Sequence, residues 1–268
     1  MKKIIHFACF GAAFFVLLSI QSTLAAEVPD NLQDLQNKAK SGDKTAQIDL
    51  GLKYLFGKGL EKNGVLAKLW LEKAAQSGHA GAQLGMGYLF EEGIDIPKDQ
   101  KAAAHWYEKA ATQGHPAAQA RLGFLYKAGI NGQPDFKVAA KWLEKAAKKG
   151  DAFAQANLAQ LFENGLGVPK DEKIALKWYT LAANLDHVES QTKLGHFYEN
   201  GLGTKADPIL AYMWYSIAGV WKHVGESLQP DDPRNGLAKV LTPAEIEKAE
   251  IMATDWWIQH FEKAAHKK

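Results

Sequence analysis

Cysteine is almost absent from this sequence. The 268 residues contain one, Cys9, which lies in an apolar segment near the N-terminus. It stands too early, and in the wrong apolar context, for a lipoprotein cleavage box. The rest of the chain therefore has no disulfides and no thiol chemistry. It must be held together by packing alone, even in an oxidising compartment.

The chain also lacks an excess of charge of either sign. Without Lys2 and Lys3 it has 30 basic and 30 acidic residues, a net charge near zero. Such a balance gives no electrostatic attraction to nucleic acid or to acidic lipid. We therefore expect neither nucleic acid nor a membrane surface as a partner.

Long hydrophobic runs are missing except at the N-terminus. Lys2 and Lys3 precede an apolar stretch from Ile4 to Ile20, and small residues follow up to Ala26. This order is typical of a secretory signal peptide over residues 1–26, with cleavage after Ala25 or Ala26. It predicts a periplasmic or secreted protein with no stable membrane insertion after cleavage. The alternative is a retained anchor, because the run is only just short of the ~20 residues that span a bilayer.

Catalytic and metal-binding motifs are absent too: there is no phosphate loop, zinc signature or supported acidic pair. Ser-x-x-Lys occurs at residues 41–44 and 190–193, but without the Ser-Asp-Asn and Lys-Thr-Gly elements of penicillin-recognising enzymes. Ser190 stands where other parts of the chain have Ala, which indicates a small packing residue. The sequence thus predicts a protein that is not an enzyme and has no cofactor; a penicillin-binding or β-lactamase-like enzyme is the disfavoured alternative.

What the sequence does have is a 36-residue repeat, present in five copies. Each copy contains Ala-Gln (Ser-Gln in the fifth), an aromatic residue eight positions on, a Gly three further, and later a Trp between two alanines. A fixed period of this length marks a stacked-repeat architecture. The Trp positions are Trp70, Trp106, Trp142, Trp178 and Trp214.

Each copy is expected to form two helices. In the first copy, Leu50, Gly51 and Tyr54 share one helical face, and Gly57 ends that helix. The second helix presents Trp70 and Leu71 on one face. Glycine inside a helix costs about 1 kcal/mol relative to Ala, so the recurrent Gly at position 51 and its equivalents needs a compensation. We expect it to make room for the bulky Trp of the second helix.

Three of the copies begin with a histidine and a fourth with Asp151, a row that invites a metal interpretation. Stacked helices lie about 8–10 Å apart, whereas ligands of one zinc ion lie ~2 Å from it. Residues one copy apart therefore cannot share an ion, and we interpret them as helix-start caps. The histidines are His79, His115 and His187.

One helix pair cannot cover its own apolar face, so neighbouring pairs must stack and the two ends must be capped. Thr242, Pro243 and Glu245 form the pattern of a capping box with Pro at the first helical position. The predicted organisation is a signal peptide at 1–26, an N-terminal capping helix at 27–44, five repeats at 45–221, a loop at 222–241 and a C-terminal capping helix at 242–268.

The consensus Ala-Gln-x-x-Leu-Gly-x-x-Tyr, Gly-x-Gly and Ala-x-x-Trp-x-x-x-Ala-Ala-x-x-Gly resembles the Sel-one-like repeat, an elongated relative of the tetratricopeptide repeat. Departures are mild, such as Ala159 for Gly and Asp95 for the second Gly of the turn. The resemblance implies an all-α fold, an α-solenoid formed as a right-handed superhelix of antiparallel helix pairs. It also implies a non-catalytic scaffold for protein–protein contacts.

The resemblance further implies that the first helices line a concave groove. Three rows carry over from tetratricopeptide groove positions, and the first turns from apolar and aromatic to polar along the array. Aromatic anchors with a charged rim are suited to binding a peptide. The rows are Leu52, Tyr88, Phe124, Gln160 and His196; Leu55, Glu91, Lys127, Glu163 and Glu199; and Phe56, Glu92, Ala128, Asn164 and Asn200.

The alternative is that these aromatic side chains only pack against neighbouring helices. With groove binding, the sequence predicts an exported monomeric adaptor for another protein, such as a cell-wall enzyme or an envelope protein. A secreted protein that contacts a host protein is the second interpretation, and it differs in location rather than in binding physics.

Overall fold

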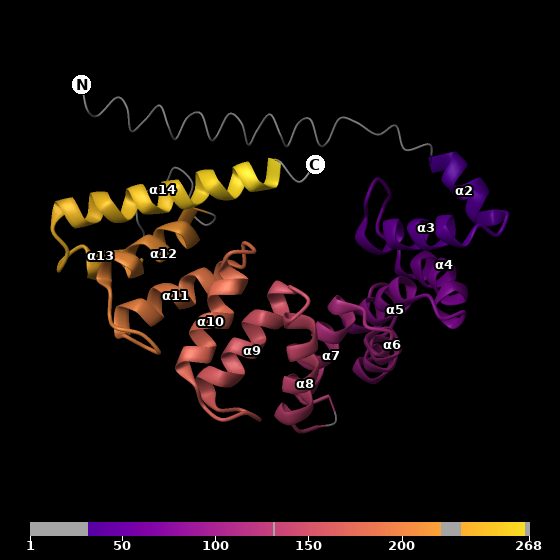
Figure 1. The fold of residues 1–268 in the computed structure, drawn as a ribbon. Helices are drawn as coiled ribbons and strands as arrows, with labels where there is room; N and C mark the ends of the chain where they lie inside the picture. Colours follow the sequence, from indigo (N-terminus) through magenta and orange to yellow (C-terminus); the bar gives the residue numbers. More distant parts are fainter. Residues whose placement is uncertain (1–31, 131, 221–231, 266–268) are drawn as a thin grey trace.

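The computed structural model describes residues 32–130, 132–220 and 232–265, and all regular elements in these ranges are helices (Figure 1). The predicted signal peptide and the first part of the predicted 222–241 loop lie outside the described residues. The helices are α2 (Leu32–Lys40), α3 (Lys44–Phe56), α4 (Gly64–Gln76), α5 (Ala80–Glu92), α6 (Gln100–Thr112), α7 (Pro116–Ala128), α8 (Phe136–Ala147), α9 (Ala152–Asn164), α10 (Glu172–Ala183), α11 (Val188–Asn200), α12 (Pro208–Val220), α13 (Arg234–Leu237) and α14 (Pro243–Ala265).

These helices pack in consecutive pairs, from α3 with α4 to α11 with α12, and each pair stacks on the next. The stack bends into an arch with α2 and α14 at its two ends (Figure 1). In two places the first helix of one repeat also contacts the first helix of the next repeat: α3 contacts α5, and α7 contacts α9. Second helices show no comparable contact with one another in the described ranges. Because a curved stack is tighter on its inner side, the first helices line the inner surface. The predicted all-α solenoid is confirmed.

Each helix pair is closed by the same turn chemistry. The first helices end at a glycine in the left-handed conformation, such as Gly57 at φ 69°, where glycine carries no Cβ penalty. The second helices begin at an Asp or Asn whose side chain accepts a backbone N–H, as Asp171 does from Ile174 at 2.9 Å. The backbone N–H of the same capping residue donates to the carbonyl of the aromatic residue in the first helix, as from Asp171 to Phe162 at 2.9 Å. These contacts hold the two helices of a pair antiparallel.

The recurrent glutamine ties each repeat to the one before it. Gln83 is buried, and its amide nitrogen donates to the carbonyl oxygen of Ala75, at the end of the preceding second helix, at 3.0 Å. Such a bond satisfies one of the carbonyls that a helix C-terminus leaves without an intrahelical partner. The same contact recurs at Gln47, Gln119, Gln155 and Gln191.

The glycine inside the first helix does not accommodate the Trp, and that prediction is wrong. A Cβ at Gly87 would lie 2.4 Å from the ring of Tyr107, the residue that follows the Trp. A Cβ at Gly51 or Gly123 would likewise meet the leucine that follows the Trp, Leu71 or Leu143. A Cβ at Gly195 would meet Tyr215. The Trp side chains pack instead at the interface with the preceding repeat, as Trp106 does beside α4 and Trp142 beside α6, and they are half-buried except for the buried Trp214.

The two ends of the stack are closed differently. At the N-terminal end, α2 takes the place of a second helix and buries Ala39 against α3. At the C-terminal end, α14 packs on α12. The capping box is present: the Thr242 backbone N–H donates to Glu245 at 2.8 Å, and the Glu245 N–H donates to the Thr242 hydroxyl at 3.3 Å. Within the predicted 222–241 loop, the short helix α13 forms at Arg234–Leu237 and buries Leu237.

The helix α14 also reaches back to the end of α10. His260 contacts the Asp186 carboxylate at 2.9 Å and stacks on Trp256 at 4.7 Å. The Trp256 ring nitrogen donates to Asn184 at 3.2 Å. Asp186 stands where the first three repeats have glycine, and it keeps the positive φ, at 62°. This departure from the repeat pattern therefore serves the contact with the C-terminal helix.

Candidate functional site: the inner surface

Aromatic side chains gather on the inner surface of repeats 1–4. The rings of Phe56 and Tyr88 lie 5.2 Å apart, and those of Phe124 and Phe153 lie 5.4 Å apart. Arg121 lies between the two pairs, over Tyr88 at 5.7 Å and over Phe153 at 5.3 Å. We call these five residues the aromatic–arginine row. Phe56 is 47% exposed, and the other three rings are half-buried.

The first predicted row is thus partly accessible and partly used in packing. Tyr88 and Phe124 face a neighbouring ring on one side, as the packing interpretation requires, yet both keep exposed surface. Leu52 and Gln160 are half-buried, and His196 is exposed. Phe153 and Arg121 were missed in the sequence, because neither falls in a row carried over from the tetratricopeptide groove. The signal that could have found them is the change of residue type along their own rows, where Arg121 is aligned with Gly85 and Asn157.

The second predicted row is mainly structural. Glu91 is 7% exposed, so its predicted place on the accessible rim is wrong. The Tyr107 hydroxyl donates to its carboxylate at 2.6 Å. The same bond joins Tyr179 to Glu163 at 2.6 Å and Tyr215 to Glu199 at 2.9 Å. Burial is the larger cause that raises the pKa of each tyrosine well above its usual value, and the hydrogen bond to the carboxylate is the second cause.

In the repeats that lack this glutamate, the residue that faces its position from the second helix is not a tyrosine. Repeat 1 has Leu55 and Leu71 at these two positions, and repeat 3 has Lys127 and Leu143. Leu55, Leu71 and Leu143 are completely buried. Glutamate therefore occurs at this position only where a tyrosine hydroxyl faces it.

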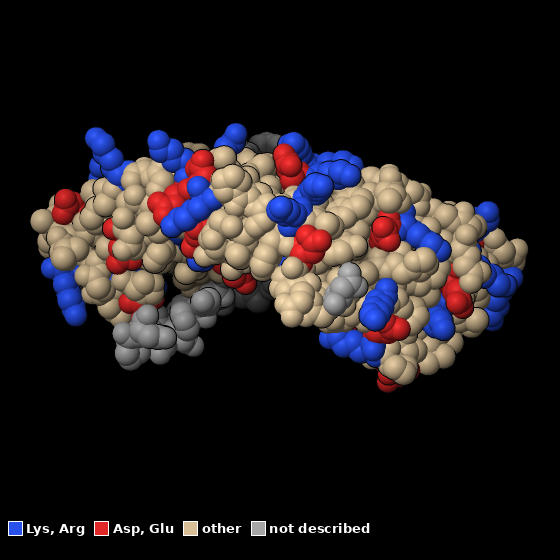
Figure 2. Space-filling view, turned by 90° about the horizontal axis from the view of Figure 1, so that it is seen from below, with Lys and Arg blue, Asp and Glu red and all other residues tan. Residues whose placement is uncertain are grey.

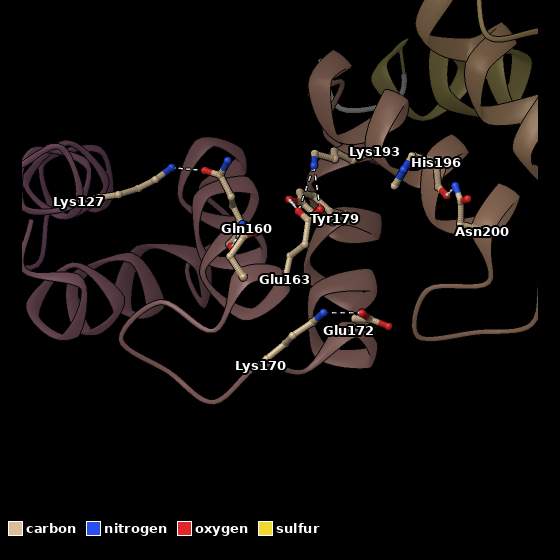
Figure 3. A network of polar contacts seen from close by, with 10 residues as sticks. Lys127, Gln160, Glu163, Lys170, Glu172, Tyr179, Lys193, His196 and Asn200 are labelled. Atoms are coloured by element: carbon tan, nitrogen blue, oxygen red, sulfur yellow. Dashed lines mark hydrogen bonds and ion pairs between the residues drawn. The ribbon is translucent and has the colours of Figure 1, made fainter.

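Polar pairs across the repeat boundaries follow the same row (Figure 3). The Lys127 ammonium donates to Asn157 at 2.7 Å and to the side-chain oxygen of Gln160. The Lys193 ammonium donates to the two oxygens of Glu163 at 2.9 and 3.2 Å. Burial lowers the pKa of Lys127. These predicted groove residues link neighbouring repeats and leave little charge free for a partner.

The C-terminal half of the inner surface is polar. His196 lies beyond Lys193 in Figure 3, where the Asn200 side chain donates to the His196 backbone oxygen at 2.9 Å. Glu199 and Asn164 are exposed. The inner surface thus changes from aromatic in repeats 1–3 and at Phe153 to polar in the rest of repeat 4 and in repeat 5.

Two of the three histidines in the row serve as helix caps. The ring nitrogen Nδ1 of His79 accepts the Ala82 N–H at 3.3 Å, and that of His187 accepts the Ser190 N–H at 3.2 Å. His115 makes no such bond, although it occupies the same position. Burial lowers the pKa of His115 and His187. The part of the chain that the structure describes contains no group of three residues suited to hold a metal ion.

The Ser-x-x-Lys pattern at residues 190–193 does not bring a base to a nucleophile. Ser190 is completely buried, and its hydroxyl lies 3.0 Å from Nδ1 of His187. The Lys193 ammonium pairs instead with Glu163. A serine without access to solvent cannot meet a substrate, so the packing interpretation of Ser190 agrees with the geometry.

On the face shown in Figure 2, Lys and Arg are interspersed with Asp and Glu. Within the described ranges, none of the helices has the length and hydropathy needed to span a bilayer.

Comparison with known proteins agrees with the repeat pattern. The Sel1 repeat family model matches residues 44–79, 80–115, 116–151, 152–187 and 188–219. A Sel1 repeat protein from Oxalobacter formigenes has 29% identity and a TM-score of 0.62, over 80% of this chain and 98% of that one. The protein c5321, a protective antigen of uropathogenic Escherichia coli with an SLR fold, has 27% identity and a TM-score of 0.53 over 88% of this chain.

This chain spans only 57% of the length of c5321. No curated protein matches it. Proteins built from Sel1 repeats are generally non-catalytic scaffolds that bind other proteins. With five matched repeats over residues 44–219, the chain belongs to the Sel1 repeat family.

Proposed function

We propose that the protein is an exported, non-catalytic scaffold that holds a segment of a partner protein on its inner surface. The aromatic–arginine row carries this proposal. It joins residues of four consecutive repeats through ring contacts of 5.2–5.4 Å and through Arg121, and it lies on the side where the first helices are closest. Partly exposed aromatic residues with an arginine are the composition of binding hot spots.

Export is supported by the apolar N-terminal segment, residues 4–20, behind two lysines. The lack of cysteine beyond residue 26 suits an oxidising compartment, because no thiol can be mispaired there. The partner is then a cell-wall enzyme or another envelope protein.

Paired capture experiments test the inner surface. The chain without residues 1–26 is used as bait on envelope extract, beside Phe56→Ala on the inner surface and Leu69→Ala on α4. Phe56 is 47% exposed and Leu69 is 58% exposed, so both variants should fold. We expect a partner that binds the parent chain and the Leu69 variant but is lost from the Phe56 variant. Equal capture by all three would refute the proposed surface.

A second candidate is a protein that acts outside the cell on a host molecule. The likeness to c5321, which is described as a protective antigen, favours this location. Fractionation of cells into periplasm, outer surface and medium separates the two candidates, because only the second requires the protein outside the outer membrane.

A further inference from the structure

Arg121 differs from the other residues that share its position in the repeat. The equivalent residues are Asp49, Gly85, Asn157 and Lys193. Only Arg121 lies over aromatic rings of both neighbouring repeats, Tyr88 at 5.7 Å and Phe153 at 5.3 Å. Its side chain is 37% exposed. A planar cation held against two rings keeps its orientation before any ligand arrives.

The hydrogen-bond donors of this guanidinium are not used within the described residues. A guanidinium has five N–H donors. The Glu91 carboxylate forms an ion pair with Arg121 at 3.7 Å from Nη1, which is beyond hydrogen-bond distance. The Tyr107 hydroxyl already donates to the other oxygen of Glu91. Lys127 and Lys193, in contrast, both donate to side chains of a neighbouring repeat.

An arginine that lies over two rings and makes no hydrogen bond within the described residues is matched to a carboxylate. The fork of N–H groups can donate two parallel bonds to the two oxygens of an Asp or Glu side chain. Apolar surface flanks it on both sides, from Phe56 and Tyr88 on one side and from Phe124 and Phe153 on the other. A ligand for this site therefore combines one carboxylate with apolar groups before and after it.

Building on the proposed function, we infer that the partner presents an acidic side chain to Arg121, with apolar side chains on either side against the two aromatic pairs. The acidic residue fixes the register of the bound segment, and the apolar residues supply most of the buried area. The polar surface of repeats 4 and 5 lies beyond this anchor.

The test uses a library of random linear dodecapeptides selected on the chain without residues 1–26. We expect enriched sequences with one Asp or Glu between apolar residues. A synthetic peptide of the enriched sequence and its amide version, Glu replaced by Gln, are then titrated calorimetrically. Either Arg121→Gln or the peptide amide should weaken binding about ten-fold to about a hundred-fold, and the two changes together should cost little more than one.

The matched control is Lys145→Gln. Lys145 lies over the ring of Trp142 at 4.3 Å on the second helix of the same repeat, so its replacement removes a charge over an aromatic ring away from the inner surface. We expect binding by this variant to equal that of the parent chain. Arg121→Lys keeps the charge but loses the fork, and should give an intermediate affinity. It also serves as the second variant if Arg121→Gln fails to fold.

The outcomes separate this inference from the proposed function. Peptides that lose affinity with Phe56→Ala and Phe153→Ala, yet bind equally well to Arg121→Gln, would overturn the acidic anchor and leave the inner surface as the binding site. Enrichment that is insensitive to all three substitutions, or no enrichment at all, would contradict the proposed function itself.

Discussion

Replacing Tyr107 with Phe tests how a glutamate is stabilised inside the stack. The substitution keeps the ring that fills the space over Gly87 and removes only the hydroxyl that donates to Glu91 at 2.6 Å. Tyr107 is completely buried and Glu91 is 7% exposed, so water cannot readily replace the lost donor. A hydrogen bond to a buried charge contributes about 1.5–3 kcal/mol, and we expect the free energy of unfolding to fall by about 2–3 kcal/mol.

The chain contains its own graded controls. In Tyr179→Phe the carboxylate of Glu163 keeps its two contacts with Lys193, so the loss should be about 1–2 kcal/mol. In Tyr215→Phe the exposed Glu199 can bind water, and the loss should stay below about 1 kcal/mol. Repeat 1 supplies a rescue: Glu91→Leu with Tyr107→Leu copies the buried Leu55 and Leu71, and should recover most of the stability.

Urea unfolding followed by far-ultraviolet circular dichroism measures the series, provided that the m-value is unchanged. The expected order of loss is Tyr107, Tyr179, Tyr215. The reasoning is refuted if Tyr107→Phe costs no more than Tyr215→Phe, because burial of the carboxylate would then not set the value of the bond.

Three further predictions follow from the caps, the turns and the C-terminal helix. Burial lowers the pKa of His115 and His187 in the folded chain, so each contributes stability above its unfolded pKa of about 6.5 that is lost as the pH falls below it. His115→Asp with His187→Asp, which copies Asp151, should therefore reduce the loss of stability between about pH 7 and about pH 5 in urea titrations; an unchanged slope would contradict the assignment. Gly167→Ala should destabilise by more than about 2 kcal/mol, since φ is +70° and the new Cβ would lie 2.3 Å from the Phe136 carbonyl carbon. Gly132→Ala is its control at φ +92° with nothing within 4 Å, and should cost about 1 kcal/mol in the same urea assay; equal losses would exclude the close contact as the cause. His260→Ala should increase amide hydrogen exchange in α14 while leaving α5 unchanged, because Asp186 and Trp256 lose their shared partner; unaltered exchange in α14 would show that this contact does not hold the helix.

The sequence predicts the stack well because its signals are local and repeated. The helix-ending Gly57 and its equivalents, the capping Asp171 and the capping box at Thr242 each act within a few residues, and five copies establish the period. Such signals fix where helices begin and end. They do not specify which side chain meets which across a helix pair.

The candidate site was harder to predict because it depends on contacts between residues 16 to 33 positions apart in the sequence. In the sequence Glu91 resembles an exposed charge, whereas in the structure it is buried and accepts a hydrogen bond from the hydroxyl of Tyr107. Phe153 belongs to another row than Phe124, and only the stacking of repeats 3 and 4 brings their rings together. Arg121 becomes distinctive only through its two rings. The groove rows carried over from the tetratricopeptide repeat therefore predict which side of the helix a residue lies on. Whether that residue packs or stays accessible depends on the side chains of neighbouring helices.

The contact between His260 and Asp186 limits how the gene for this protein can lengthen or shorten. A copy inserted between the fourth and fifth repeats would move α14 one unit away from Asp186, and a deletion there would bring it against a glycine. Copies gained or lost upstream of the fourth repeat leave that contact intact. Duplication within the first three repeats can thus vary the reach of the array while the last two units and the closing helix keep their contact.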